Sequence, residues 1–211
     1  MKKLWMLPIF SLVFTSTQII SSASAIAATL FQAKIDVEQE VCSKPAEPCP
    51  TTSDATGFFS AELNDAENTL KYTFNIDGLD LGFPIGTPQT ADSGDDIIKV
   101  HIHLGSRGVA GPVVFAPLDL TMGERDNDLA IVAPDGIIGG TLSGIWTLSE
   151  GLQDQLGNLK SEQLYVNIHS SRFLANGELR GQITKAPEPT MLVGLALVGT
   201  VGFLISKRQR N

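Results

Sequence analysis

Cysteine, histidine and tyrosine are scarce in this chain of 211 residues, which has two cysteines, three histidines and two tyrosines. The sequence contains no Cys-x-x-Cys pair, Gly-x-Ser-x-Gly turn or phosphate-binding loop, so the common redox, hydrolase and nucleotide-binding signatures are missing. Positive charge is also in short supply, with 15 Lys and Arg against 23 Asp and Glu. Such an acidic balance disfavours nucleic acid as a partner and could attract cations.

The first 27 residues have the parts of a secretory signal peptide. Lys2 and Lys3 precede an apolar stretch, Leu4–Phe14, and two small-x-small cleavage candidates follow at Ala23–Ala25 and Ala25–Ala27. A membrane anchor is the alternative, but the apolar run is short and polar residues interrupt it. We therefore expect residues 1–27 to be removed and the remainder to be exported.

The C-terminal end of the chain carries a second candidate targeting signal. Pro187, Glu188 and Pro189 precede an apolar run, Met191–Ile205, and a basic tail with Lys207, Arg208 and Arg210. As a helix this run is about 25 Å long at ~1.5 Å per residue, a marginal but workable transmembrane span. A buried C-terminal helix is the alternative, but the run has no polar face.

This order of parts resembles the PEP-CTERM sorting signal of bacterial envelope proteins. The resemblance implies that an exosortase-type membrane protease cleaves near Pro187–Pro189, and that residues 186–211 anchor the chain in the membrane until then. The basic tail would stay on the cytoplasmic side.

Both cysteines lie in one proline-rich loop, at Cys42 and Cys49. In an oxidising compartment we expect a disulfide between them. A metal-binding or redox-active pair is the alternative, but the spacing matches no common metal site.

Residues 28–185 read as one domain of short strands with almost no helix. The fold class expected is all-β, an antiparallel Greek-key sandwich or barrel. We expect one short helix from the N-cap Ser149 to Leu159 and a hairpin turn at Asn176–Gly177. The strand-like runs are Phe31–Val37, Phe58–Leu63, Leu70–Ile76, Lys99–Leu104, Val113–Phe115, Leu129–Val132, Thr141–Leu148, Tyr165–Ser170 and Glu178–Thr184.

The three histidines fall in two of these runs. Because side chains alternate along a strand, His101 and His103 share one face while Ile102 points to the other. The same count separates His169 from Ile168. If the apolar faces share one core, all three imidazoles lie on outer faces, and they converge if the two strands are neighbours.

Neutral imidazoles on one face suit copper or zinc, so His101, His103 and His169 are candidate metal ligands. Three protein ligands with an open position is also the form of a catalytic zinc site. The alternative is that the histidines hydrogen-bond to loop backbone. Asn167 and Glu178 are candidate partners of the ligands, or ordinary polar strand residues.

Two acidic groups could supply oxygen ligands to calcium, but neither has the EF-hand spacing, and solvated acidic loops are the favoured interpretation. They are Asp92, Asp95 and Asp96, and Glu124, Asp126 and Asp128. Arg180 is expected in a buried ion pair or a rim contact, and Gly181 where two backbones approach closely.

Several segments together resemble the chordin-type (CHRD) domain, from about Leu30 to Ile183. They are Ala55–Gly57, Leu70–Tyr72, Gly78–Leu79, His101–His103, Gly111–Val114, Tyr165–His169 and the closing Gly177–Ile183. The resemblance implies an immunoglobulin-like or superoxide-dismutase-like β-sandwich with no established catalytic activity.

A more distant likeness is to copper–zinc superoxide dismutase. It would match His101, His103 and His169 to three copper ligands, but a fourth histidine and a zinc cluster are missing from the sequence. We therefore expect an exported, envelope-sorted binding or structural module and not an enzyme, with a copper-dependent redox protein as the alternative.

Overall fold

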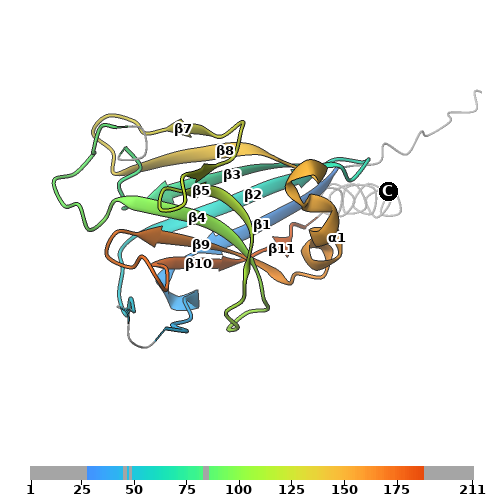
Figure 1. Ribbon diagram of the computed structural model, residues 1–211, viewed down its shortest axis with the longest axis horizontal. Helices are drawn as coiled ribbons and strands as arrows, with labels where there is room; N and C mark the ends of the chain where they lie inside the picture. Colours follow the sequence, from blue (N-terminus) through green and yellow to red (C-terminus); the bar gives the residue numbers. More distant parts are fainter. Residues whose placement is uncertain (1–27, 45–46, 48, 83–85, 188–211) are drawn as a thin grey trace, which may run out of the picture.

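The computed structural model describes residues 28–44, 47, 49–82 and 86–187, and strands dominate this part (Figure 1). A single-turn 3-10 helix, Val37–Gln39, follows the first strand. The strands are β1 (Thr29–Ile35), β2 (Thr56–Leu63), β3 (Thr69–Asp77), β4 (Ile97–Leu104), β5 (Val113–Asp119), β6 (Glu124–Arg125), β7 (Ala130–Val132), β8 (Gly139–Thr147), β9 (Leu164–Ser170), β10 (Leu179–Gln182) and β11 (Thr184–Lys185), and the α-helix is α1 (Leu152–Lys160).

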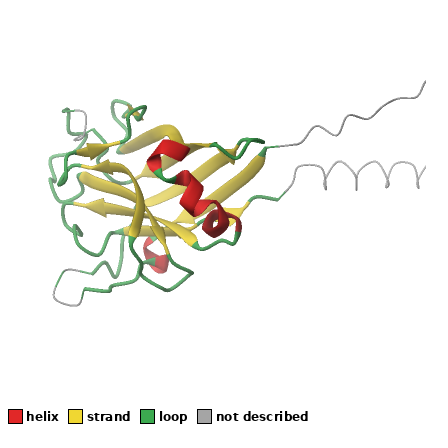
Figure 2. Ribbon diagram, turned by 45° about the vertical axis from the view of Figure 1, so that its right-hand side comes forward, coloured by secondary structure: helices red, strands yellow, loops and turns green. Residues whose placement is uncertain are grey.

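These strands form two antiparallel sheets that pack face to face (Figures 1 and 2). One has the order β11-β1-β2-β3-β8-β7 and the other the order β10-β9-β4-β5-β6. Strands β3 and β4 are consecutive but lie in different sheets, and β8 and β9 later pair with them. The expected all-β antiparallel sandwich is confirmed, whereas its immunoglobulin-like or dismutase-like form stays a prediction.

The core lies between the sheets and follows the period-two pattern of the sequence. Along β3, residues Leu70, Tyr72, Phe74 and Ile76 are buried, while the intervening side chains are more exposed. The stacked rings of Phe115 on β5 and Trp146 on β8 join the two sheets, with centroids 4.6 Å apart.

Ile102 on β4 and Ile168 on β9 are both fully buried, as the alternation of the two strands predicts. The outer face of the five-stranded sheet is covered as well, because all seven residues of β9 are buried. Arg180 on this face donates to the carbonyl oxygens of Ser106 and Val109 in the β4–β5 connection. Two further connections, β1–β2 and β9–β10, join over the same face through Lys44 and Asn176.

The end of the domain corrects the expected single strand over Glu178–Thr184. Strand β10 pairs with β9 in the five-stranded sheet, and β11 pairs with β1 in the other sheet, so the chain changes sheets at Ile183. The hairpin expected around Asn176–Gly177 is present, because β9 and β10 are consecutive antiparallel neighbours, but these two residues do not form a tight two-residue turn. Both residues lie in the longer connection between β9 and β10, where Gly177 has a φ of +93°.

The helix begins differently from the prediction. Thr147, not Ser149, caps the chain, and it starts a 3-10 turn, Leu148–Glu150. The Glu150 carboxylate accepts hydrogen bonds from the backbone N–H and the hydroxyl of Thr147, and the first of these belongs to a capping box between the two residues. Gly151 then adopts a left-handed conformation as the N-cap of α1, which begins at Leu152.

The predicted disulfide between Cys42 and Cys49 is present, with 5.7 Å between the two Cα atoms. Within the described residues, no helix has the length and apolarity needed to cross a bilayer. The expected signal peptide and the apolar run Met191–Ile205 lie outside the described residues. Pro187 of the sorting motif is described and exposed, whereas Glu188 and Pro189 are not described.

Candidate metal centre

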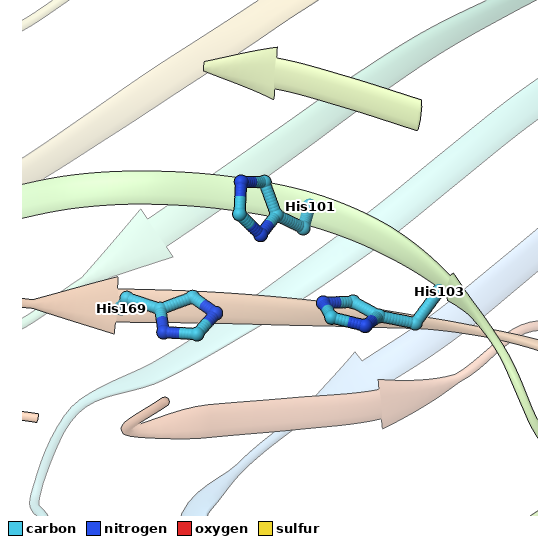
Figure 3. A group of neighbouring side chains, drawn as sticks. All are labelled: His101, His103 and His169. Atoms are coloured by element: carbon cyan, nitrogen blue, oxygen red, sulfur yellow. The ribbon is translucent and has the colours of Figure 1, made fainter. Parts of the chain in front are cut away.

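Strands β4 and β9 are antiparallel neighbours, and this pairing gathers the three histidines. His101 lies opposite Asn167, His103 opposite Tyr165, and His169 opposite Lys99. All three rings project from the same outer face and point toward one another (Figure 3). One ring nitrogen from each lies within 4.8 Å of the others.

Two of the rings are anchored to backbone carbonyl groups through Nδ1. The Nδ1 atom of His103 is 2.9 Å from the Gly111 oxygen, and that of His169 is 2.9 Å from the Leu174 oxygen. A carbonyl oxygen can only accept, so Nδ1 carries the proton in both rings and Nε2 keeps a lone pair. Both Nε2 atoms are buried and have no hydrogen-bond partner within the described part of the chain.

His101 is held the opposite way round. Its Nε2 lies 3.1 Å from Oδ2 of Asp119 on β5, and the other nitrogen, Nδ1, faces His103 and His169 (Figure 3). Asp119 is itself fixed by hydrogen bonds from the hydroxyl and backbone N–H of Thr121. This carboxylate–imidazole pair orients a ring as in the outer shell of many metal sites.

The electrostatic surroundings keep the rings neutral. Burial lowers the pKa of His103 to about 4 and that of His169 to about 3, where the nearby His101 adds to the effect. Burial also lowers the pKa of His101, against the opposing influence of Asp119. Neutral imidazole is the form that binds a metal ion, so near pH 7 the three rings need lose no proton first.

A stack of flat groups supports His103. Its ring lies parallel to that of Tyr165, with centroids 4.9 Å apart, and the Arg180 guanidinium sits 3.4 Å from the Tyr165 centroid. The Tyr165 hydroxyl accepts a hydrogen bond from the N–H of Gly111, whose carbonyl oxygen holds His103. A Cβ on Gly111 would collide with the carbonyl oxygen of Leu104, so this position requires glycine.

Arg180 is 1% exposed, and its contacts differ from both expectations. Within the described residues it stacks on Tyr165 and donates to backbone, and no carboxylate forms an ion pair with it. Glu40 lies close enough to interact electrostatically with it. Burial nevertheless raises the pKa of Glu40 to about 7, and its Oε2 has no hydrogen-bond partner in the described part of the chain.

The candidate partners of the imidazoles, Asn167 and Glu178, hydrogen-bond to other groups among the described residues. The Asn167 amide donates to the Asn176 carbonyl oxygen, and Glu178 accepts a hydrogen bond from Ser53. Gly181 does mark a close approach, because a Cβ there would lie 2.6 Å from the Lys34 oxygen.

The members of the two predicted acidic groups have different surroundings in the structure. Asp95 and Asp96 lie together with Asp80, whereas Asp92 pairs with Arg172. Asp126 is buried and accepts a hydrogen bond from the Tyr72 hydroxyl at 2.5 Å, so it is not part of a solvated acidic loop.

Sequence reasoning missed Asp119 and Tyr165 as supports of the imidazoles. Alternation along the strand puts Tyr165 on the same face as His169, but only the β4–β9 register shows that it stacks on His103. Asp119 lies 18 residues after His101, and no short motif connects them.

A family model for the CHRD domain matches residues 31–183, which include all three histidines and most of both sheets. The chain belongs to the CHRD domain family. The resemblance inferred from the closing segment Gly177–Ile183 and the earlier motifs is thereby confirmed. Searches of curated proteins and of solved structures gave no match.

Membership of the CHRD family accounts for the domain but names no ligand. The convergence of His101, His103 and His169 is therefore a property of this CHRD domain that must be interpreted from its own geometry.

Proposed function

We propose that this protein is an exported CHRD-domain module that binds one transition-metal ion, copper or zinc, through His101, His103 and His169. The observation that carries the proposal is the pair of buried Nε2 atoms without partners, together with the convergence of the three rings. Hydrogen bonding to loop backbone, the alternative role, uses only Nδ1 of His103 and His169. It leaves the second nitrogen of each ring unexplained, and a buried unpaired acceptor costs free energy.

The residues present suit such an ion. Copper and zinc prefer imidazole nitrogen, with Zn–N distances of about 2.0–2.1 Å. Ring nitrogens within 4.8 Å of one another can meet a common ion after small side-chain rotations. A bound ion would act as a Lewis acid and cross-link β4 to β9, while Asp119, Gly111 and Leu174 hold the rings in place.

Binding, and not catalysis, is the role we assign. The rings are only 5–9% exposed under the covering loops, which restricts the approach of a substrate. The open coordination position left by three ligands favours the second candidate, a copper-dependent redox protein of superoxide-dismutase-like form.

Metal titration of the purified domain, residues 28–186, tests the proposal. After treatment with a chelator, we expect calorimetry to show one Cu²⁺ or Zn²⁺ per chain. His169→Gln should abolish binding, although glutamine can still donate to the Leu174 carbonyl oxygen. Asn158→Ala on α1 is the control and should bind normally. A folded wild-type domain that binds neither ion would overturn the proposal, and superoxide consumption by the copper form would favour the second candidate.

We also propose that residues 1–27 direct export and that residues 186–211 are a sorting signal cut by an exosortase-type protease near Pro187, Glu188 and Pro189. Two boundaries support this proposal: β1 begins at Thr29, and β11 ends at Lys185. Mass spectrometry of the envelope-associated protein should find an N-terminus near Ala28 and no residues beyond Pro189. A mature chain that retains Met191–Ile205 would contradict the sorting proposal and leave the metal proposal intact.

A further inference from the structure

The histidine centre offers only neutral ligands to an ion, and we propose that it selects monovalent copper, Cu⁺, over Zn²⁺ and Cu²⁺. This inference rests on the proposed function, because it names the ion that the same site prefers. Among the described residues, the converging group consists of His101, His103 and His169, without a carboxylate or a thiolate. The two cysteines of the chain are joined in a disulfide. No ligand charge would therefore offset the charge of a bound ion.

The charged side chains that contact the rings or their supports are positive on balance. The Asp119 carboxylate lies 3.1 Å from His101, but the ammonium group of Lys99 lies 3.6 Å from the same carboxylate oxygen and compensates its charge. The Arg180 guanidinium belongs to the stack of flat groups that supports His103, and it adds a further positive charge. A dication held between the rings would meet more repulsion from these groups than a monocation would.

The titration behaviour of the rings agrees with this charge distribution. Besides burial, the positive charges of Arg180 and Lys44 lower the pKa of His103. Lys99 adds to burial and to the other imidazoles in lowering the pKa of His169. The electrostatic field that opposes a proton on these rings also opposes a second positive charge on an ion between them.

Burial strengthens the preference for the smaller charge. The three rings are only 5–9% exposed beneath the covering loops. The idealised cost of moving an ion out of water rises with the square of its charge, so a dication loses about four times as much hydration free energy as a monocation of the same size. Anionic ligands could compensate that loss, but imidazoles bring no charge.

The number of ligands also suits Cu⁺. Zn²⁺ is almost always four-coordinate in structural sites, and Cu²⁺ prefers a square-planar or tetragonal set of ligands. Cu⁺ has a filled d shell and is stable with three nitrogen ligands in a plane. The three ring nitrogens within 4.8 Å of one another supply that set without a further side chain. The protein would then store or carry reduced copper beneath its loops.

Redox titration of the copper-loaded protein under argon measures the preference directly. The full exported protein is loaded with one copper ion per chain, and the electron paramagnetic resonance signal of Cu²⁺ is followed against mediators of known potential. The potential of the bound couple should exceed that of aqueous copper by at least about 120 mV, which is a preference for Cu⁺ of about a hundredfold at about 59 mV per tenfold. When Cu⁺ and Zn²⁺ are supplied in equal amounts, the protein should retain copper.

A change of charge beside the centre provides the second measurement. Lys99→Gln should lower the potential by about 60 mV, a tenfold change in relative affinity, because Cu²⁺ then meets less repulsion. Lys71→Gln is the matched control, on the exposed side of β3 in the other sheet, and should leave the potential unchanged. A wild-type potential at or below the aqueous value, or zinc retained in place of copper, would overturn this inference and leave the metal proposal intact. A folded protein that binds none of the three ions would overturn both.

Discussion

Each imidazole of the histidine centre gives one nitrogen to a protein partner and turns the other toward the shared space. For His103 and His169 the partner is a neutral carbonyl group, and for His101 it is the charged carboxylate of Asp119. A carboxylate partner increases the basicity of a ligand ring and fixes its orientation. Asp119 should therefore influence metal affinity without touching the metal.

Asp119→Asn should weaken Zn²⁺ or Cu²⁺ binding by about 10- to 100-fold, the usual cost of removing such a partner. Competitive titration against a chelator of known affinity measures this effect. Asp128→Asn makes the same chemical change at a carboxylate that accepts the Ile145 N–H, away from the rings. Equal affinities for the two variants would show that Asp119 has no role in the centre.

Glu40 gives a prediction about pH at the same scale. Its pKa is about 7 in the folded protein and near 4.5 when unfolded, so between these values the folded state retains a proton that the unfolded state has lost. Its contribution to stability is therefore complete below pH 4.5 and disappears as the pH rises through 7.

Between pH 4.5 and 7.5, the free energy of unfolding of the wild type should fall by up to about 3 kcal/mol more than that of the Glu40→Gln variant. Chemical denaturation of both proteins in the presence of a chelator measures the difference. If the two stability curves run parallel across this range, the Glu40 carboxyl group titrates normally.

At the scale of elements, the chain crosses from β10 in one sheet to β11 in the other within a few residues. Gly181 on β10 packs against β1, where a Cβ would lie 2.6 Å from the Lys34 oxygen and 2.9 Å from Cγ1 of Ile35. The crossing therefore depends on a residue without a side chain. Gly157, inside α1, has no atom within 4 Å of the equivalent position.

These two glycines predict opposite effects of the same substitution. Gly181→Ala should destabilise the fold by about 1–3 kcal/mol through overpacking. Gly157→Ala should stabilise it by about 0.5–1 kcal/mol, because alanine has the higher helix propensity. Urea denaturation of the three proteins tests both signs. A destabilised Gly157→Ala variant would contradict the helix assignment, and a neutral Gly181→Ala variant would contradict the tight crossing.

At the scale of the whole molecule, the sandwich has a second buried layer, because connections from different parts of the chain cover the outer face of the five-stranded sheet. The β1–β2 connection carries the Cys42–Cys49 disulfide and is held by reciprocal hydrogen bonds between Lys44 and Asn176. The disulfide therefore constrains a covering connection and no strand of either sheet, so we expect the two sheets to form without it.

Replacing both cysteines with serine should lower the free energy of unfolding by about 2 kcal/mol, the value expected for a short loop, and leave the far-UV circular dichroism unchanged. Adding a reductant should bring the wild type to the same midpoint and leave the Cys42→Ser/Cys49→Ser protein unaffected. Loss of β-structure in that variant would show instead that the disulfide is required for the sandwich.

The sequence by itself determined which side of each strand faces the core, the disulfide and the family. These properties depend on local information: the alternation that separates Ile102 from His101, the short spacing of Cys42 and Cys49, and contiguous motifs such as Gly177–Ile183. Tertiary structure alone decided that β4 lies beside β9 and that loops bury the imidazoles. It also decided that Asp119 contacts His101 and that Asp80 lies with Asp95 and Asp96. The reason is that strand pairing and loop covering join residues far apart in the chain, and no local pattern specifies which distant segments meet.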